Sequence, residues 1–207
     1  MAGENKGKIV AGNFDLLHDQ FDLETDRAAV ILAASILDDL LKTVLSNRLV
    51  VNASGHDTLF DGPNAPLGSF SSRIELSYRT GVVSSTFARD LHLIRKIRNE
   101  FAHAIAGCDF KEPRVQNRIS ELIRGHKKLV TSEEHEKNIR PTPNRSSFLW
   151  VVSWMCFYLE QAAQEIGRIN SCTEEFGYTD FRGSNHPLWS KSCSRQVTGV
   201  ERSEPPE

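Results

Sequence analysis

One helical segment near the N-terminus restricts the fold more than any other part of the sequence. Residues 28–37 read AAVILAASIL, and Asp38 and Asp39 follow directly. A helix that spans a membrane needs about 20 apolar residues, so this run of ten is too short to cross one. The longer segment 28–45 is apolar on most sides of a helix. We therefore expect it at the centre of the fold, covered by other elements.

The rest of the sequence supplies helices that can cover this one. Thr25 or Asp26 can cap the central helix, Ser84 or Ser85 can cap a later one, and Pro113 suits a first helical turn. The expected helices span residues 13–22, 26–49, 69–78, 85–105, 113–123 and 145–168. No segment has a convincing strand pattern. The sequence predicts an all-α fold, a single compact bundle of about six helices.

The domain organisation follows from composition along the chain. We expect one helical domain over residues 13–168, with a flexible N-terminus at 1–12. Charged residues and two prolines predict a linker at 125–144 within that domain. Residues 169–207 are rich in Ser, Gly, Pro and charge, which predicts a disordered C-terminal tail.

Charge and cysteine content narrow the class of protein. A net charge of -2 and a pI of about 6.4 give no global attraction to nucleic acid. The four cysteines form no CxxC pair, which is typical of reduced thiols in a cytoplasmic protein. The N-terminus lacks the apolar core of a signal peptide. We expect neither a metal nor a cofactor, because the histidines outside the helix at 85–105 are scattered along the sequence. They are His18, His56, His126, His135 and His186.

The helix expected at 85–105 has three faces instead of two. Successive residues lie about 100° apart, which puts Ile94, Ile97 and Phe101 on one apolar side. Lys96 and Glu100 fall on a solvated side. A third sector lies between the two and holds mostly polar residues: His92, Arg95, Arg98, Asn99, Ala102 and His103.

The polar residues of this sector can have a structural role, as members of a buried network of ion pairs. Arg98 borders the apolar face, where a guanidinium group is costly unless an acid or an anion pairs with it. Asp38 lies inside the central apolar helix and needs a partner for the same reason. A buried network would join the charged residues Glu24, Arg27, Asp38, Arg95 and Arg98. In the same way, Arg73 follows Gly68 and Ser69 at a helix start, which suits either a bound anion or an ordinary serine cap.

A functional interpretation of the same sector is the alternative. Arginine suits carboxylate or phosphate groups, and histidine exchanges a proton near neutral pH. Asn99 lies one turn before His103, so their side chains can meet. Arg98 and His103 are about 140° apart around an ideal helix. A binding or catalytic role therefore implies a homodimer, in which two copies bring both groups to one cleft.

Three stretches of the chain resemble the MltR family, which is named for the mannitol operon repressor. They are ETDR at 24–27, LFDGPNAPLGSFSSRI at 59–74 and DLHLIRKIRNEFAH at 90–103. The resemblance covers roughly residues 14–125 and implies an all-helical regulator of transcription. Because the sequence has neither a helix-turn-helix pattern nor a basic surplus, we expect regulation through a protein partner. A repressor that binds DNA directly is the alternative.

A shorter resemblance concerns Arg98, Asn99 and His103. Their spacing is similar to the R-x4-6-H motif of the HEPN superfamily, helical domains that include metal-independent endoribonucleases. The resemblance implies that His103 assists proton transfer, that Arg98 stabilises charge on a phosphate and that Asn99 orients the pair. It also allows an RNA-binding module without catalysis.

Overall fold

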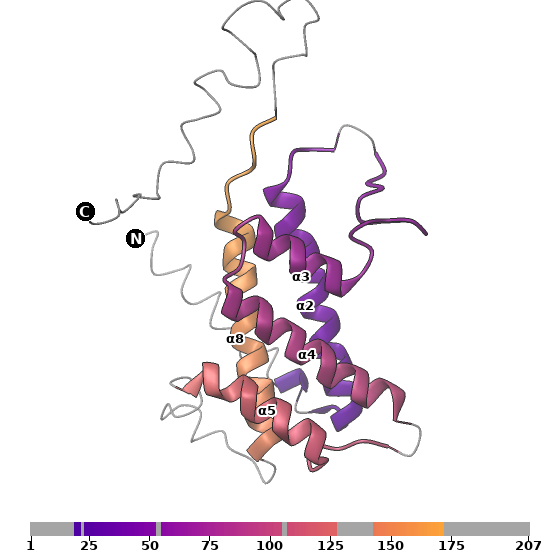
Figure 1. Ribbon diagram of the computed structural model, residues 1–207, viewed down its shortest axis with the longest axis vertical. Helices are drawn as coiled ribbons and strands as arrows, with labels where there is room; N and C mark the ends of the chain where they lie inside the picture. The colour runs from indigo at the N-terminus through magenta and orange to yellow at the C-terminus, as the bar shows by residue number, and fades with distance from the viewer. Residues whose placement is uncertain (1–18, 22, 53–54, 105–106, 128–142, 172–207) are drawn as a thin grey trace, which may run out of the picture. The chain divides into compact units, whose positions relative to one another are not determined.

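The computed structural model describes residues 19–21, 23–52, 55–104, 107–127 and 143–171 (Figure 1). Within these ranges the regular structure is helical and no strand occurs, so the predicted all-α bundle is confirmed. The predicted flexible N-terminus, most of the predicted linker and nearly all of the predicted tail lie outside the described residues. None of the described helices is long and apolar enough to cross a membrane.

Helix α2, Asp26–Arg48, is the central element of the bundle. It packs against α3, α4 and α8, which is the position expected from its apolar sequence. The Thr25 side chain accepts a hydrogen bond from the backbone N–H of Ala28 and caps the helix. Helix α8, Pro143–Glu165, runs along α2. The two helices bury mainly aliphatic side chains, among them Leu37, Leu41, Val44, Val151, Val152 and Leu159.

Helices α3, Phe70–Arg79, α4, Ser85–His103, and α5, Pro113–Gly125, follow one another as antiparallel neighbours. Figure 1 shows them in front of α2 and α8, with α4 between α3 and α5. Ser69 and Ser84 cap α3 and α4 through side-chain hydrogen bonds to backbone N–H groups. The tight turn between these two helices contains Gly81, whose φ of 70° favours glycine.

Three phenylalanines connect the end of α4 to α8. Phe110, in the segment before α5, lies 5.3 Å from Phe101 and 5.7 Å from Phe148 between ring centroids. All three rings are buried. Because these contacts join segments far apart in the sequence, they help to fix where the C-terminal half of α4 lies.

The helix bounds differ from the predicted ones at a few ends. Helix enters both ends of the predicted linker, because α5 continues through Gly125 and α8 begins at Pro143. Helix α8 ends at Glu165, three residues earlier than expected. Helix α4 ends at His103, and residues 105–106 are outside the described part.

Candidate functional site

The polar sector of α4 contains side-chain donors that find no acceptor among the residues that the structure describes. Arg95, Arg98 and Asn99 are half-buried, whereas His103, in the last turn, is exposed. The Nε atom of Arg95 is buried and has no hydrogen-bond partner among the described residues. Arg98 and Asn99 make no hydrogen bond or ion pair within the described part of the chain. The wheel position predicted for Arg98, at the edge of the core, agrees with its partial burial.

Asp38 of α2 pairs with Arg73 of α3. The Arg73 Nη1 donates to Asp38 Oδ1 at 2.7 Å, and its Nε donates to the Leu67 carbonyl at 2.8 Å. Arg73 is only 8% exposed, so its charge needs this partner. Burial raises the pKa of Asp38 above its ordinary value, while Arg73 and, less strongly, Arg98 oppose that rise. Asp38 therefore has Arg73 as its direct partner and Arg98 as a nearby charge.

Two other members of the expected buried network, Arg27 and Glu24, make contacts elsewhere. Arg27 Nη2 donates to the Ala102 carbonyl at 2.8 Å, where the end of α4 leaves carbonyl groups without helical donors. The Glu24 carbonyl accepts from Arg145 at 2.8 Å, and Arg145 also donates to Asp26 at 3.0 Å. A continuous chain from Glu24 through Arg27 and Asp38 to the arginines of α4 does not form. Arg27 instead binds the end of α4, and Asp38 pairs with Arg73.

A buried carboxylate on α4 forms a charged cluster that sequence reasoning missed. Asp90 is 0% exposed. Its Oδ1 accepts from Arg89 Nε at 2.9 Å and Nη2 at 2.7 Å, and its Oδ2 lies 2.9 Å from His126 Nε2. A Cβ built on Gly125 would lie 2.9 Å from Arg89 Nη2, so glycine allows α5 to end this close to α4. One signal was present, since Asp90 falls on the apolar side of the helical wheel.

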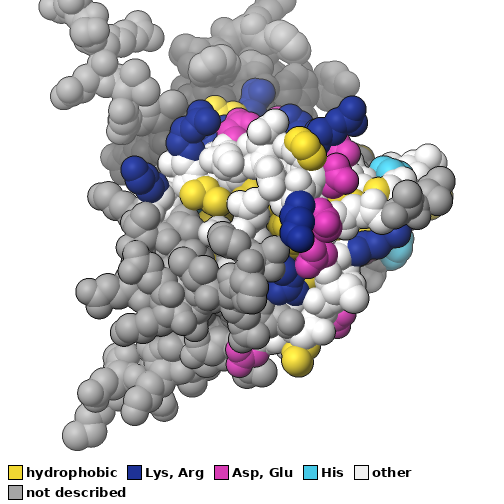
Figure 2. Space-filling model, turned by 90° about the horizontal axis from the view of Figure 1, so that it is seen from below, with side chains coloured by type: hydrophobic (Ala, Val, Ile, Leu, Met, Phe, Trp, Pro, Cys, Tyr) yellow, Lys and Arg dark blue, Asp and Glu magenta, His cyan; other side chains and the backbone are white. Residues whose placement is uncertain are grey.

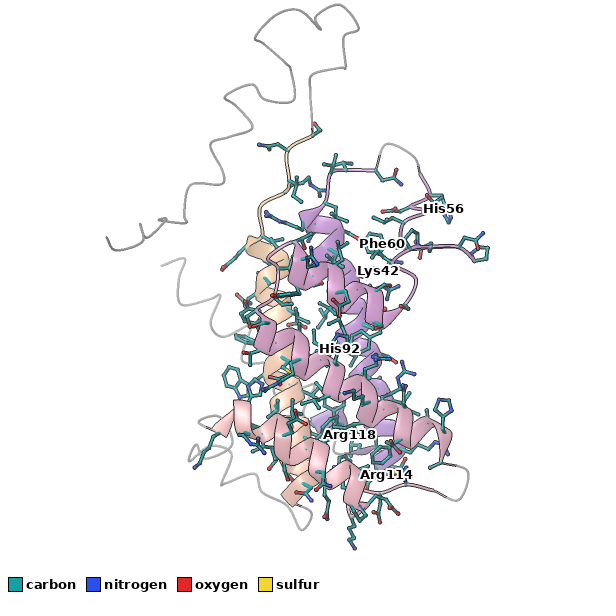
Figure 3. All side chains as sticks on the ribbon, in the orientation of Figure 1. Lys42, His56, Phe60, His92, Arg114 and Arg118 are labelled. Atoms are coloured by element: carbon teal, nitrogen blue, oxygen red, sulfur yellow. The ribbon has the colours of Figure 1, made fainter. Side chains whose placement is uncertain are left out.

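An ion pair joins the C-terminal part of α4 to α5. Arg118 Nη1 donates to Glu100 Oε1 at 2.7 Å. Figure 3 shows Arg118 and Arg114 on α5, the helix that lies beside α4. Arg118, with smaller contributions from Arg114 and His103, lowers the pKa of Glu100 below its usual value. Glu100 was expected on a solvated face, but α5 covers part of it.

A groove lies over α4 between α3 and α5. Its volume is about 470 Å³. Its lining comes from all three helices: Glu75, Tyr78, Ser85, Ala88, Arg89, His92, Leu93, Lys96 and Glu121. His92 Nε2 lies 3.1 Å from Glu75 Oε1 across it. The residues predicted as catalytic, Arg98, Asn99 and His103, are not part of this lining.

The face of the molecule drawn in Figure 2 carries both positive and negative side chains. Figure 2 shows Lys and Arg side chains interleaved with Asp and Glu on the face viewed from below. The described side chains on that face form no continuous basic patch. Among the residues that the structure describes, no three His, Cys, Asp or Glu side chains are placed to hold a metal ion.

Comparison with known proteins identifies a fold. No family model matches the chain, and no curated protein matches it. Among solved structures, the chain is similar to one in the X-ray structure of the MtlR-HPr complex from Escherichia coli. The TM-score is 0.53 at 17% identity, and the match covers 72% of this chain and 98% of the other. At this identity the similarity shows the fold alone, which agrees with the helical fold expected from the MltR resemblance.

Proposed function

We propose that this chain is a helical regulatory protein that acts by binding a protein partner. The similarity to the MtlR chain carries the proposal, because it extends over nearly all of that chain, which was solved in complex with HPr. The sequence blocks at 24–27, 59–74 and 90–103 support the same class of protein. By this proposal HPr, or a small protein like it, is the first partner to test.

The arrangement of α4 favours a protein partner over direct binding to DNA. A recognition helix must lay one face into the major groove. The outward side chains of α4, such as His92 and Lys96, instead form the floor of a groove with α3 and α5 as walls. Asp90, on the same helix, is buried beneath this surface. The mixed charges in Figure 2 also offer little attraction for a phosphate backbone.

Titration calorimetry tests the proposal directly. The full chain is titrated with purified HPr, and saturable binding with a Kd in the micromolar range or tighter is the expected result. The same sample is titrated with operator-length duplex DNA over a series of salt concentrations. If HPr gives no heat and DNA binds with nanomolar affinity and a steep salt dependence, direct DNA binding becomes the better candidate and binding of a protein partner the weaker one.

A second candidate is a HEPN-like, metal-independent endoribonuclease or RNA-binding module. The observation that favours it is that Arg98 and Asn99 keep free donors and His103 is exposed. Because Arg98 and His103 lie on different sides of α4, this candidate needs a homodimer to complete its site. Cleavage of single-stranded RNA in EDTA is measured for the native chain and for His103→Ala, with the oligomeric state taken from light scattering. Equal cleavage by both proteins, or none by either, excludes catalysis through His103.

A further inference from the structure

The C-terminal half of α4 carries side-chain donors that have no acceptor among the described residues, and one of them, the Arg95 Nε, is also shielded from water. The Arg95 Nε is buried and unpartnered. Arg98 and Asn99 are half-buried, and neither makes a hydrogen bond or an ion pair with the described residues. A buried N–H group without an acceptor is destabilising, and most native proteins avoid it. The Arg95 Nε is such a group, and a ligand with oxygen acceptors at this place would remove the cost.

Helix geometry places these three side chains together. Arg98 and Asn99 follow Arg95 by three and four residues, and residues at these spacings are neighbours on a helix surface, with Cβ atoms about 5–6 Å apart. Two guanidinium groups and one amide then present many N–H donors from one side of α4. The ligand that fits is rich in acceptors and carries negative charge.

Two acceptors near the arginines of α4 already bind other side chains. Asp38, the acid whose pKa responds to Arg98, has Oδ1 bound to Arg73 at 2.7 Å. The Ala102 carbonyl, one turn beyond Arg98, accepts from Arg27. Both partners are themselves cations. They reduce the local negative charge and leave the arginines of α4 with a surplus of positive charge.

We infer that Arg95, Arg98 and Asn99 form a binding site for the phosphate group of a small phosphorylated metabolite. A phosphate monoester carries a charge of about -1.5 to -2 near neutral pH, which matches two guanidinium groups. A phosphodiester or a carboxylate carries a single negative charge and matches them less well. Arginine forks bind phosphate oxygens in pairs, and the Asn99 amide adds a neutral donor. The site lies outside the groove and does not depend on the protein partner proposed above.

Calorimetry on the full chain tests the site with four probes: inorganic phosphate, glucose 6-phosphate, glucose and a short single-stranded RNA. We expect saturable binding of both phosphates and none of glucose. Arg95→Gln and Arg98→Gln should each weaken binding of glucose 6-phosphate roughly tenfold or more, because each removes a charge-assisted contact. Asn99→Ala should weaken it less.

Lys96→Gln is the matched control. Lys96 lies between the two arginines in sequence, carries the same charge and is exposed, but its side chain lines the groove. Its loss should change the affinity by only about twofold, since exposed charges are screened by salt. Circular dichroism confirms that each variant is folded. The inference is overturned if the folded native chain shows no saturable binding of phosphate up to about 10 mM ligand. A Kd above that concentration corresponds to a binding free energy weaker than about 3 kcal/mol. Equal weakening by Lys96→Gln, or tighter binding of RNA than of the monoester, also overturns it.

Discussion

Replacing Arg89 and His126 together by alanine removes both side chains that contact the Asp90 carboxylate. The carboxylate is 0% exposed, so in the double variant it remains inside the bundle without a partner. Breaking a buried ion pair in this way costs about 3–5 kcal/mol of unfolding free energy. With an m-value of about 2 kcal/mol/M, the urea midpoint should fall by about 2 M. Helix signal in circular dichroism at pH 7 gives both quantities.

Adding Asp90→Leu to the double variant distinguishes a buried charge from a general loss of contacts. Asp90 is on the apolar side of α4, so leucine at this position leaves no charge in the core. The triple variant should recover more than half of the lost free energy, because apolar residues often replace buried ion pairs without cost. Lys96→Ala combined with Arg124→Ala is the control, since both side chains are exposed. A triple variant no more stable than the double one would refute the reasoning.

Three further predictions rest on single side chains. Burial raises the pKa of Asp38 above its ordinary 3.8, so its contribution to stability is full below that value and is lost as the pH rises through the folded pKa. Urea titrations from pH 4 to 6 should therefore show the native chain losing stability relative to Asp38→Asn, and a gain would mean that the pairing with Arg73 outweighs burial. Burial raises the pKa of Cys156 to about 12, so iodoacetamide at pH 8 should modify this thiol in urea but not in the folded protein. Mass spectrometry measures the modification, and rapid labelling of the folded state would contradict the burial of Cys156. Phe110→Ala should cost about 3–5 kcal/mol, measured as a loss of urea midpoint, and a cost below about 1 kcal/mol would show that the contacts with Phe101 and Phe148 add little.

Local signals were enough to predict the helices. Thr25, Ser69 and Ser84 each cap a helix, and each was one of the candidates for that helix start, because capping depends on residues only three positions apart. The apolar side of α4 was also predicted, since one helical period determines it. These features require no knowledge of which elements meet.

Pairing between helices could not be predicted in the same way. Asp38 was expected to pair within a network of α2 and α4, but Arg73, 35 residues along the chain, donates to it. His126 was considered one of several scattered histidines, yet it lies 2.9 Å from Asp90, 36 residues earlier. One sequence gives the angle of a side chain around its helix and leaves open which neighbour it faces. Whether Arg98, Asn99 and His103 have a functional role remains a prediction for the same reason.

The packing of α8 on α2 affects how the chain folds as it is synthesised. About a hundred residues separate the two helices, whereas α3, α4 and α5 each meet their neighbour soon after emerging. At 5–20 residues per second, roughly 5–20 s pass between completion of α2 and the arrival of α8. During this interval the apolar side of α2 that α8 later covers is exposed on a nascent chain. We expect this stage to be the one most prone to aggregation and most dependent on chaperones.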